Sequence, residues 1–158
     1  MDKLLFQDKD QLYDVMVDSK AYEQMLFYCA LSNPYETGGI LIGNYSSDNV
    51  MANVLKITSS PKSSNQSRFS FHRGISGLKK LLDLAWDNGQ YYLGEWHYHP
   101  NSLPSPSIID KNQMIVLSQD QKLKCPEPIL IIVGGCKDNW KIDVRVFVNK
   151  QEIILNKV

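Results

Sequence analysis

The chain has 158 residues, of which 43% are hydrophobic and 22% are charged, a composition typical of folded soluble proteins. This length suits one compact domain over residues 1–158, large enough to bury a core without stabilising cross-links. The 17 basic and 17 acidic side chains give a formal net charge of zero. Binding to nucleic acid needs a surplus of positive charge that displaces phosphate counterions, so nucleic acid is not expected as a partner.

No segment of the sequence predicts targeting or membrane insertion. The start, MDKLLFQDKD, holds only three apolar residues in a row before charged residues resume, and a signal peptide needs a longer apolar stretch. The longest apolar run, ILIIV at 129–133, falls well short of the roughly 20 residues that cross a bilayer. We therefore expect a soluble, cytoplasmic protein without a membrane partner.

The cysteines predict neither a disulfide framework nor a zinc finger. Cys29, Cys125 and Cys136 are odd in number and widely spaced, and no Cys-x-x-Cys pair occurs. Both kinds of site need paired cysteines. Reduced and mostly buried thiols are expected.

The first third of the chain predicts strands around one helix. Alternating apolar residues indicate strands at 4–7, 11–17, 38–46 and 50–58. Asp18 or Ser19 can cap a helix that runs to about Leu31 and ends before Asn33-Pro34. The apolar stripe of this helix is expected to comprise Tyr22, Met25, Leu26 and Cys29.

The rest of the chain also alternates between strands and helices. A polar loop at 59–67 precedes an alternating strand at 68–73. The helix at 75–89 has an apolar face made of Ile75, Leu78, Leu81, Leu82, Ala85 and Trp86. There follow a strand at 91–99, a proline-rich connector at 101–107, a helix from Ile108 to about Gln121, and strands at 128–135, 140–148 and 152–156. The interleaving predicts an α/β fold with one mixed sheet and helices packed on it.

Possible metal ligands lie at the end of one predicted strand and the start of the next helix. Residues i and i+2 of a strand point to the same face, so His97 and His99 can reach one metal ion. Asp110 follows eleven residues after His99, and the stiff connector can fold its helix back over the strand end. Two nitrogens and one carboxylate leave a position for water, as in catalytic zinc sites. The alternative is a histidine pair on a half-exposed strand without metal.

Hydrolysis at such a site also needs a general base. Glu36 is the first candidate, because it precedes a strand opened by two glycines, which allow close backbone approach. Glu95 is the rival base and shares the histidine face, although a supporting contact to a histidine suits it better. Ser107, at the predicted helix start, can donate to an oxyanion or serve only as a helix cap.

The remaining aromatic and histidine side chains near these residues are expected to be structural. Trp96 and Tyr98 alternate with the histidines, so they face the opposite side of the strand and belong to the core. His72 is expected to be an ordinary polar residue with a hydrogen-bond partner, not a metal ligand.

The segment EWHYHPNSLPSPSIID, with Glu36 upstream, resembles the JAMM motif of the JAB/MPN metalloprotease family. That motif is a glutamate, then His-x-His-Pro, then Ser-x-x-Asp, with ten residues between the second histidine and the aspartate, as in this sequence. The resemblance implies zinc ligands at His97, His99 and Asp110, a general base at Glu36 and an oxyanion donor at Ser107. It also implies a mixed sheet flanked by helices, in a fold related to the cytidine deaminases.

The flanking segments GGILIG, SSPKSSNQSRFSFHR and YYLGEWHYHP resemble a bacterial stand-alone subgroup of this family. In that subgroup a short JAB domain often accompanies ubiquitin-activating-like proteins, and the best-known setting is the anti-phage cyclic-oligonucleotide operon, CBASS. The resemblance implies an isopeptidase that hydrolyses the bond after the C-terminal glycine of a ubiquitin-like modifier or of a conjugated nucleotidyltransferase. E1-like and E2-like proteins are then possible operon partners.

Two other function classes use a related fold and compete with the isopeptidase. Many JAB/MPN domains have lost the metal and act as scaffolds, but this sequence keeps every residue of the motif. A cytidine deaminase also uses zinc and a glutamate, but it needs a Pro-Cys-x-x-Cys ligand pair, which this sequence lacks.

Overall fold

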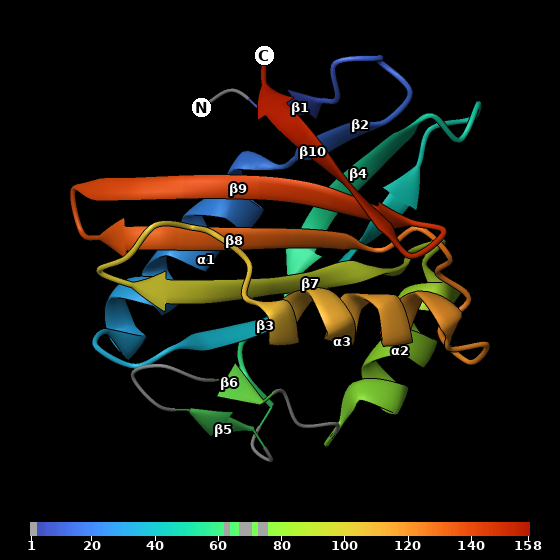
Figure 1. The fold of residues 1–158 in the computed structure, drawn as a ribbon. Coiled ribbons are helices and arrows are strands. Elements are labelled where there is room, and N and C mark those ends of the chain that lie inside the picture. The colour runs from blue at the N-terminus through green and yellow to red at the C-terminus, as the bar shows by residue number, and fades with distance from the viewer. Residues whose placement is uncertain (1–2, 62–63, 67–70, 73–75) are drawn as a thin grey trace.

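The computed structural model describes residues 3–61, 64–66, 71–72 and 76–158. The strands in this part of the chain are β1 (Leu4–Gln7), β2 (Asp14–Val17), β3 (Thr37–Tyr45), β4 (Met51–Ile57), β5 (Asn65–Gln66), β6 (Phe71–His72), β7 (Tyr91–Pro100), β8 (Ile129–Cys136), β9 (Asn139–Val148) and β10 (Gln151–Lys157). The helices are α1 (Ser19–Ser32), α2 (Leu78–Asp87) and α3 (Ile108–Gln119). Figure 1 shows their arrangement.

Eight of the strands form a closed sheet in the order β1-β10-β9-β8-β7-β3-β4-β2, and β1 also pairs with β2. The sheet is mixed, because β2 runs parallel to β4 and β7 runs parallel to β8. The prediction of a mixed α/β sheet is thus confirmed, but the sheet curls into a barrel instead of lying open between helices. Alternation along a strand shows which residues share a face, but it does not show which strands pair with one another. The closure of the sheet through β1 could therefore not be predicted.

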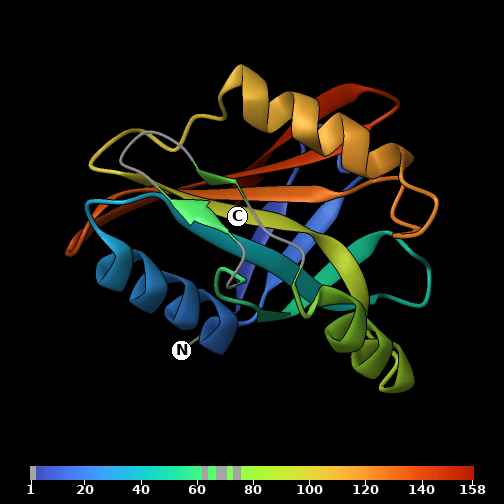
Figure 2. The same cartoon turned by 90° about the horizontal axis from the view of Figure 1, so that it is seen from below.

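The helices cover both faces of the sheet. On the inner face, Met25 of α1 packs in one cluster with Trp96 of β7. On the outer face, α2 packs against a cluster containing Ile40, and Met114 of α3 packs against Ile132. Figure 2 shows α1 and α3 on opposite sides of the strands. The end of β7 and the starts of β3 and α3 meet on the outer face of the sheet.

Most element boundaries agree with the prediction, with one clear exception near the N-terminus. The second strand begins at Asp14 instead of residue 11. The Asp8 carboxylate accepts the backbone N–H groups of Leu12 and Tyr13, each at 2.8 Å. These bonds hold the chain in a turn and keep it out of the ladder.

The predicted buried face of the helix at 75–89 is partly wrong. Trp86 is 61% exposed, and its ring packs edge-on against Tyr91. The part of α2 that meets the sheet is thus narrower than the periodicity indicates. Of the strand predicted at 68–73, only Phe71–His72 is described, and it pairs with β5. Ile75 and the side chain of His72 lie outside the described residues.

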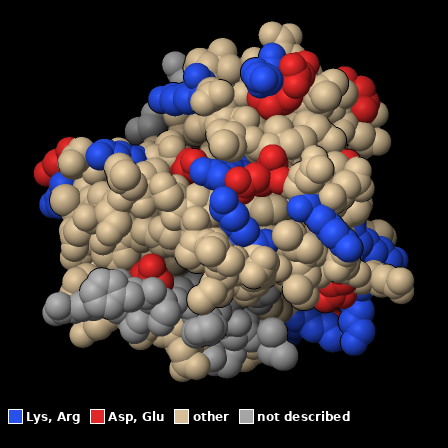
Figure 3. All heavy atoms as spheres, in the orientation of Figure 1, with Lys and Arg blue, Asp and Glu red and all other residues tan. Residues whose placement is uncertain are grey.

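Charge is mixed over the face of the molecule seen in Figure 3, where Lys and Arg lie beside Asp and Glu. Among the ion pairs of the molecule, Arg145 contacts Asp143 and Glu152, and Lys111 also contacts Glu152. Cys29 and Cys125 are buried and all three thiols are free, as predicted. Among the described residues, no helix is long and apolar enough to span a membrane.

Candidate metal centre

The two faces of β7 carry different side chains: the aromatic residues of one face pack in the core, and the histidines lie on the other face. Trp96 and Tyr98 are fully buried on the inner face. Trp96 Nε1 donates to the carbonyl of Thr58, and the Tyr98 hydroxyl donates to the carbonyl of Gly135, both at 2.8 Å. These anchored rings fix the strand, so His97 and His99 point together to the outer face. The prediction that Trp96 and Tyr98 are core residues is confirmed.

The connector 101–107 brings α3 back to the histidines by lying against β8. A Cβ added at Gly134 would come within 2.4 Å of the Ser102 carbonyl oxygen and 2.7 Å of the Pro104 nitrogen. Only glycine permits this approach. The helix start is then fixed by a capping box, in which Ser107 Oγ accepts the Asp110 N–H and Asp110 Oδ2 accepts the Ser107 N–H.

Asp110 stands between the two histidines as a result. Its Oδ1 lies 3.2 Å from His97 Nδ1, and its Oδ2 lies 3.3 Å from His99 Nε2. Glu36, directly before β3, places Oε1 3.9 Å from His99 Nε2. The second of the two glycines after it allows the expected close approach, because a Cβ at Gly39 would meet the Thr58 carbonyl oxygen at 2.1 Å. The structure therefore gathers the predicted ligands, the predicted base and Ser107 at one place.

The charges of this cluster perturb one another. Burial raises the pKa of the Asp110 carboxyl, but hydrogen bonds from His97 and His99 outweigh it and hold that pKa well below its usual value. Burial lowers the pKa of His99, but the hydrogen bond and charge of Asp110 and the charge of Glu36 raise it overall. Burial raises the pKa of Glu36, against the opposing charge of His99. The cluster is thus an electrostatic unit, as expected for a functional site.

The donor set suits zinc in its chemistry, and two of its distances are close to those of a zinc site. Zinc binds imidazole nitrogen and carboxylate oxygen at about 2.0–2.1 Å, so neighbouring donors in a tetrahedral site lie roughly 3.3 Å apart. The 3.2 and 3.3 Å distances between Asp110 and the histidines match that spacing. Within the described residues, however, no group of three or more His, Cys, Asp or Glu side chains is already gathered around a metal position. The two nitrogens face different oxygens of Asp110, so metal binding would require the side chains to turn.

Glu95 is a poorer candidate for the base than Glu36. It lies on the histidine face, as predicted, but it is fully buried and its Oε2 accepts a hydrogen bond from the Tyr92 hydroxyl. A general base must reach a water beside the substrate, and Glu36, whose side chain is 14% exposed, can do so. Glu95 instead supports the strand that carries the ligands.

One residue that positions the site was not found from the sequence. Asn33 Nδ2 donates to the Tyr98 hydroxyl at 2.7 Å and lies 3.4 Å from Asn101 Oδ1. These contacts tie the end of α1, just before Glu36, to the histidine strand and the connector. The partners are 65 and 68 residues away, so no local pattern could have indicated them.

Replacing Ser107 with alanine separates its two possible roles. Loss of the cap is expected to cost about 1 kcal/mol of stability, and loss of an oxyanion donor would reduce kcat by about 10²–10³-fold. Ser107→Thr, which keeps the hydroxyl, should restore both. The measurements are thermal unfolding and hydrolysis rate. If kcat falls only in proportion to the fraction of protein that is unfolded, Ser107 acts as a helix cap alone.

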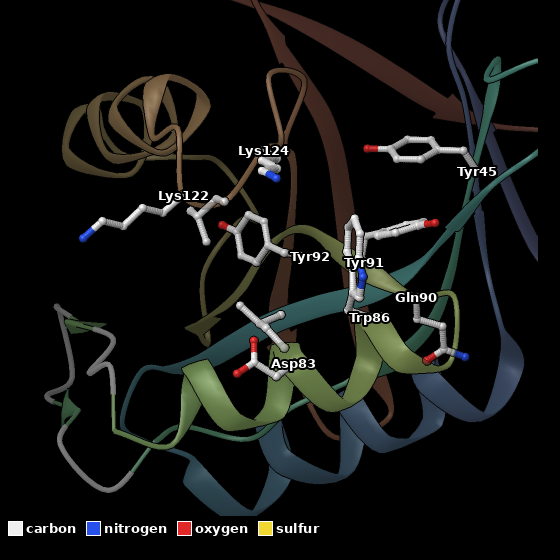
Figure 4. A pocket seen from close by; sticks show the side chains of 10 residues that line it. Tyr45, Asp83, Trp86, Gln90, Tyr91, Tyr92, Lys122 and Lys124 are labelled. Carbon is white, nitrogen blue, oxygen red and sulfur yellow. The ribbon is translucent and has the colours of Figure 1, made fainter.

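A separate pocket lies at the opposite end of β7 (Figure 4). Its volume is about 360 Å³, and its wall includes Trp86, Tyr91 and Lys124. The Lys124 ammonium lies 5.9 Å from the centre of the Trp86 ring. None of the predicted site residues lines this pocket, so it is distinct from the histidine cluster.

Two solved structures share the fold with this chain. The solution structure of a protein from Desulfitobacterium hafniense matches with a TM-score of 0.62 and 20% identity, over 91% of this chain and 89% of that one. A protein from Salinibacter ruber matches with a TM-score of 0.56 and 16% identity, over 87% and 85%. At these identities the likeness supports the fold alone.

Relatives by sequence share one name. A protein from Enterobacter hormaechei subsp. hoffmannii, named CD-NTase/cGAS isopeptidase, is 41% identical over 130 residues, covering 82% of this chain and 72% of the relative. A protein of the same name from Escherichia coli is 31% identical over 108 residues, covering 66% and 65%. Another from Vibrio cholerae is 25% identical over 141 residues, covering 87% and 86%.

A family model described as prokaryotic homologs of the JAB domain matches residues 18–146. The matched range begins at the cap of α1 and ends in β9, so it contains Glu36, both histidines, Ser107 and Asp110. The resemblance found in the sequence is thereby confirmed. This chain belongs to the family of prokaryotic homologs of the JAB domain.

Proposed function

We propose that this protein is a zinc-dependent isopeptidase that releases a conjugated protein from its target. The observation that carries the proposal is the cluster of Glu36, His97, His99 and Asp110, with contacts of 3.2 to 3.9 Å between their nitrogen and oxygen atoms. The relatives named CD-NTase/cGAS isopeptidase support a hydrolase acting on a protein conjugate. The family alone is a weaker argument, because one fold hosts several functions.

Three side chains of this cluster would hold the zinc: His97, His99 and Asp110. When bound there, the ion would supply Lewis acidity, which polarises a carbonyl and makes a water molecule more acidic. The low pKa of Asp110 favours the ionised carboxylate that metal binding needs.

Glu36 would move the proton during hydrolysis. The water oxygen bonds to the carbonyl carbon while its proton passes to the Glu36 carboxylate. The carbon–nitrogen bond then breaks, and Glu36 returns that proton to the leaving lysine amine, so the products are a free amine and a carboxylic acid that keeps the second proton of the water until it ionises. The Ser107 Oγ accepts the Asp110 N–H, which leaves its own hydrogen to donate to the oxyanion.

The proposed substrate is a protein joined through its C-terminal glycine to a target amine. It would be a ubiquitin-like modifier or, following the name of the relatives, a conjugated nucleotidyltransferase. The proposed setting is a CBASS-like anti-phage system, in which this enzyme reverses the conjugation made by E1-like and E2-like partners. The family match and the shared name support this setting.

Removal of zinc tests the proposal. Protein purified without chelators or a histidine tag should contain about one zinc per chain, measured by mass spectrometry, and should release a nucleotidyltransferase linked through its C-terminus to a lysine amine. Dialysis against a chelator should abolish release, and added zinc should restore it where magnesium does not. A protein that holds no zinc after refilling and dialysis, and releases nothing, would instead be a scaffold.

A further inference from the structure

The pocket at the far end of β7 has no part in the reaction described above. It lies between α2, the start of β7 and the turn that follows α3 (Figure 4). Trp86 projects from the helix, Tyr91 and Tyr92 from the strand, and Lys122 and Lys124 from the turn. Small-molecule sites have volumes of roughly 300–1,000 Å³. The 360 Å³ of this pocket therefore gives room for one small ligand.

One wall of the pocket is aromatic and open to solvent. Trp86 is 61% exposed and Tyr91 is 39% exposed, and the two rings pack edge-on with their centres 5.3 Å apart. Tryptophan is highly buried on average in folded proteins, so packing of the core does not account for the exposure of this ring. Because the neighbouring tyrosine holds it in place, the indole presents a flat apolar surface on which another planar ring can stack.

Another wall of the pocket carries positive charge. The Lys124 ammonium lies 5.9 Å from the centre of the Trp86 ring, whereas Lys122 extends away from the aromatic side chains in Figure 4. Asp83 also lines the pocket, but its carboxylate is 3.0 Å from the Lys79 ammonium, which partly offsets its charge. Lys124 is therefore placed to meet the anionic group of a ligand that lies against the rings.

We propose that this pocket binds a free mononucleotide, with the base stacked on Trp86 and the phosphate held by Lys124. An exposed aromatic ring beside an ammonium matches the two parts of a nucleotide, a planar base and a phosphate. The volume suits one nucleotide, and the zero net charge of the chain does not favour a longer nucleic acid strand. The inference goes beyond the proposed isopeptidase and does not depend on it, because the pocket and the metal centre are lined by different residues.

Isothermal titration calorimetry of the whole chain with AMP, GMP, CMP and UMP tests the inference. At least one of these nucleotides should bind more tightly than its nucleoside, ribose 5-phosphate or inorganic phosphate, because only the nucleotide meets both walls of the pocket. The inference is overturned if none of the four binds at millimolar concentration, or if the nucleoside or phosphate alone binds as tightly. A single-stranded octanucleotide that binds more tightly than every mononucleotide would also overturn it.

Substitution of the tryptophan tests the stacking surface. Trp86→Ala should weaken nucleotide binding by about tenfold, and Trp86→Phe should keep most of the affinity. The matched control is Phe27→Ala on α1, which removes a ring that is also 61% exposed and also packs edge-on against a tyrosine. This control should leave nucleotide binding unchanged.

Substitution of the lysine tests the phosphate contact. Lys124→Met should weaken nucleotide binding by about tenfold and leave nucleoside binding unchanged. Lys80→Met, which removes an exposed lysine of α2 that does not line this pocket, should change neither. Thermal unfolding confirms that each variant is folded. If folded Trp86→Ala or folded Lys124→Met keeps the wild-type affinity for the nucleotide, the ligand is bound elsewhere and the inference fails.

Discussion

Glu36→Gln is expected to lower the rate of conjugate hydrolysis by about 10²–10⁴-fold, the usual contribution of a general base. Glutamine keeps the size of the side chain but cannot take the proton of the attacking water. Because Glu36 is not a predicted ligand and glutamine has the same shape, zinc content and the thermal unfolding midpoint should stay at wild-type values. The rate is measured with saturating substrate, and zinc by mass spectrometry.

Two further substitutions make this result specific. Glu23→Gln changes an exposed glutamate on α1 and should leave the rate unchanged. Glu95→Gln tests the rival base, whose carboxylate is bonded to Tyr92. If Glu36→Gln retains turnover while Glu95→Gln abolishes it without loss of fold or zinc, the assignment of the base is wrong and Glu95 takes that role.

Asp110→Ala is expected to remove both the metal and the activity. It deletes a carboxylate that contacts both histidines, at 3.2 and 3.3 Å. It also deletes the hydrogen bond from the Ser107 N–H at 2.8 Å, which is half of the capping box. Zinc should fall from about one per chain to near zero, hydrolysis should be lost, and unfolding should cost about 1–3 kcal/mol less.

Asp110→Asn distinguishes ligand loss from misfolding. Its amide oxygen can still accept the Ser107 N–H, so the helix start should persist while the negative charge is lost. Zinc affinity should therefore fall with little change in stability. The matched control is Asp83→Ala, which removes an exposed helical aspartate paired with Lys79 and should leave zinc content intact. Full zinc occupancy in Asp110→Ala would exclude this residue as a ligand.

Local sequence patterns were sufficient for most elements. The spacing of Met25 and Cys29 predicted the buried side of α1, and Asp18 caps it through a hydrogen bond from Lys20 N. Alternation in β7 predicted that His97 and His99 share a face opposite Trp96 and Tyr98. These features depend on residues within a few positions of one another, where helix and strand geometry alone decides the direction of a side chain. The exposure of Trp86 shows the limit of such predictions. Helical periodicity identifies the apolar face of α2, but it does not show how much of that face the sheet covers.

The sequence by itself indicated the residues that are proposed to carry the chemistry of this protein, namely Glu36, the histidine pair, Ser107 and Asp110, because their types and spacing suit a zinc-dependent hydrolysis. The tertiary structure decided how they meet. Closure of the sheet, the approach of the connector to Gly134 and the bond from Asn33 to Tyr98 join residues far apart in the chain. Long-range packing leaves no periodic trace in a single sequence, so these contacts required the folded molecule.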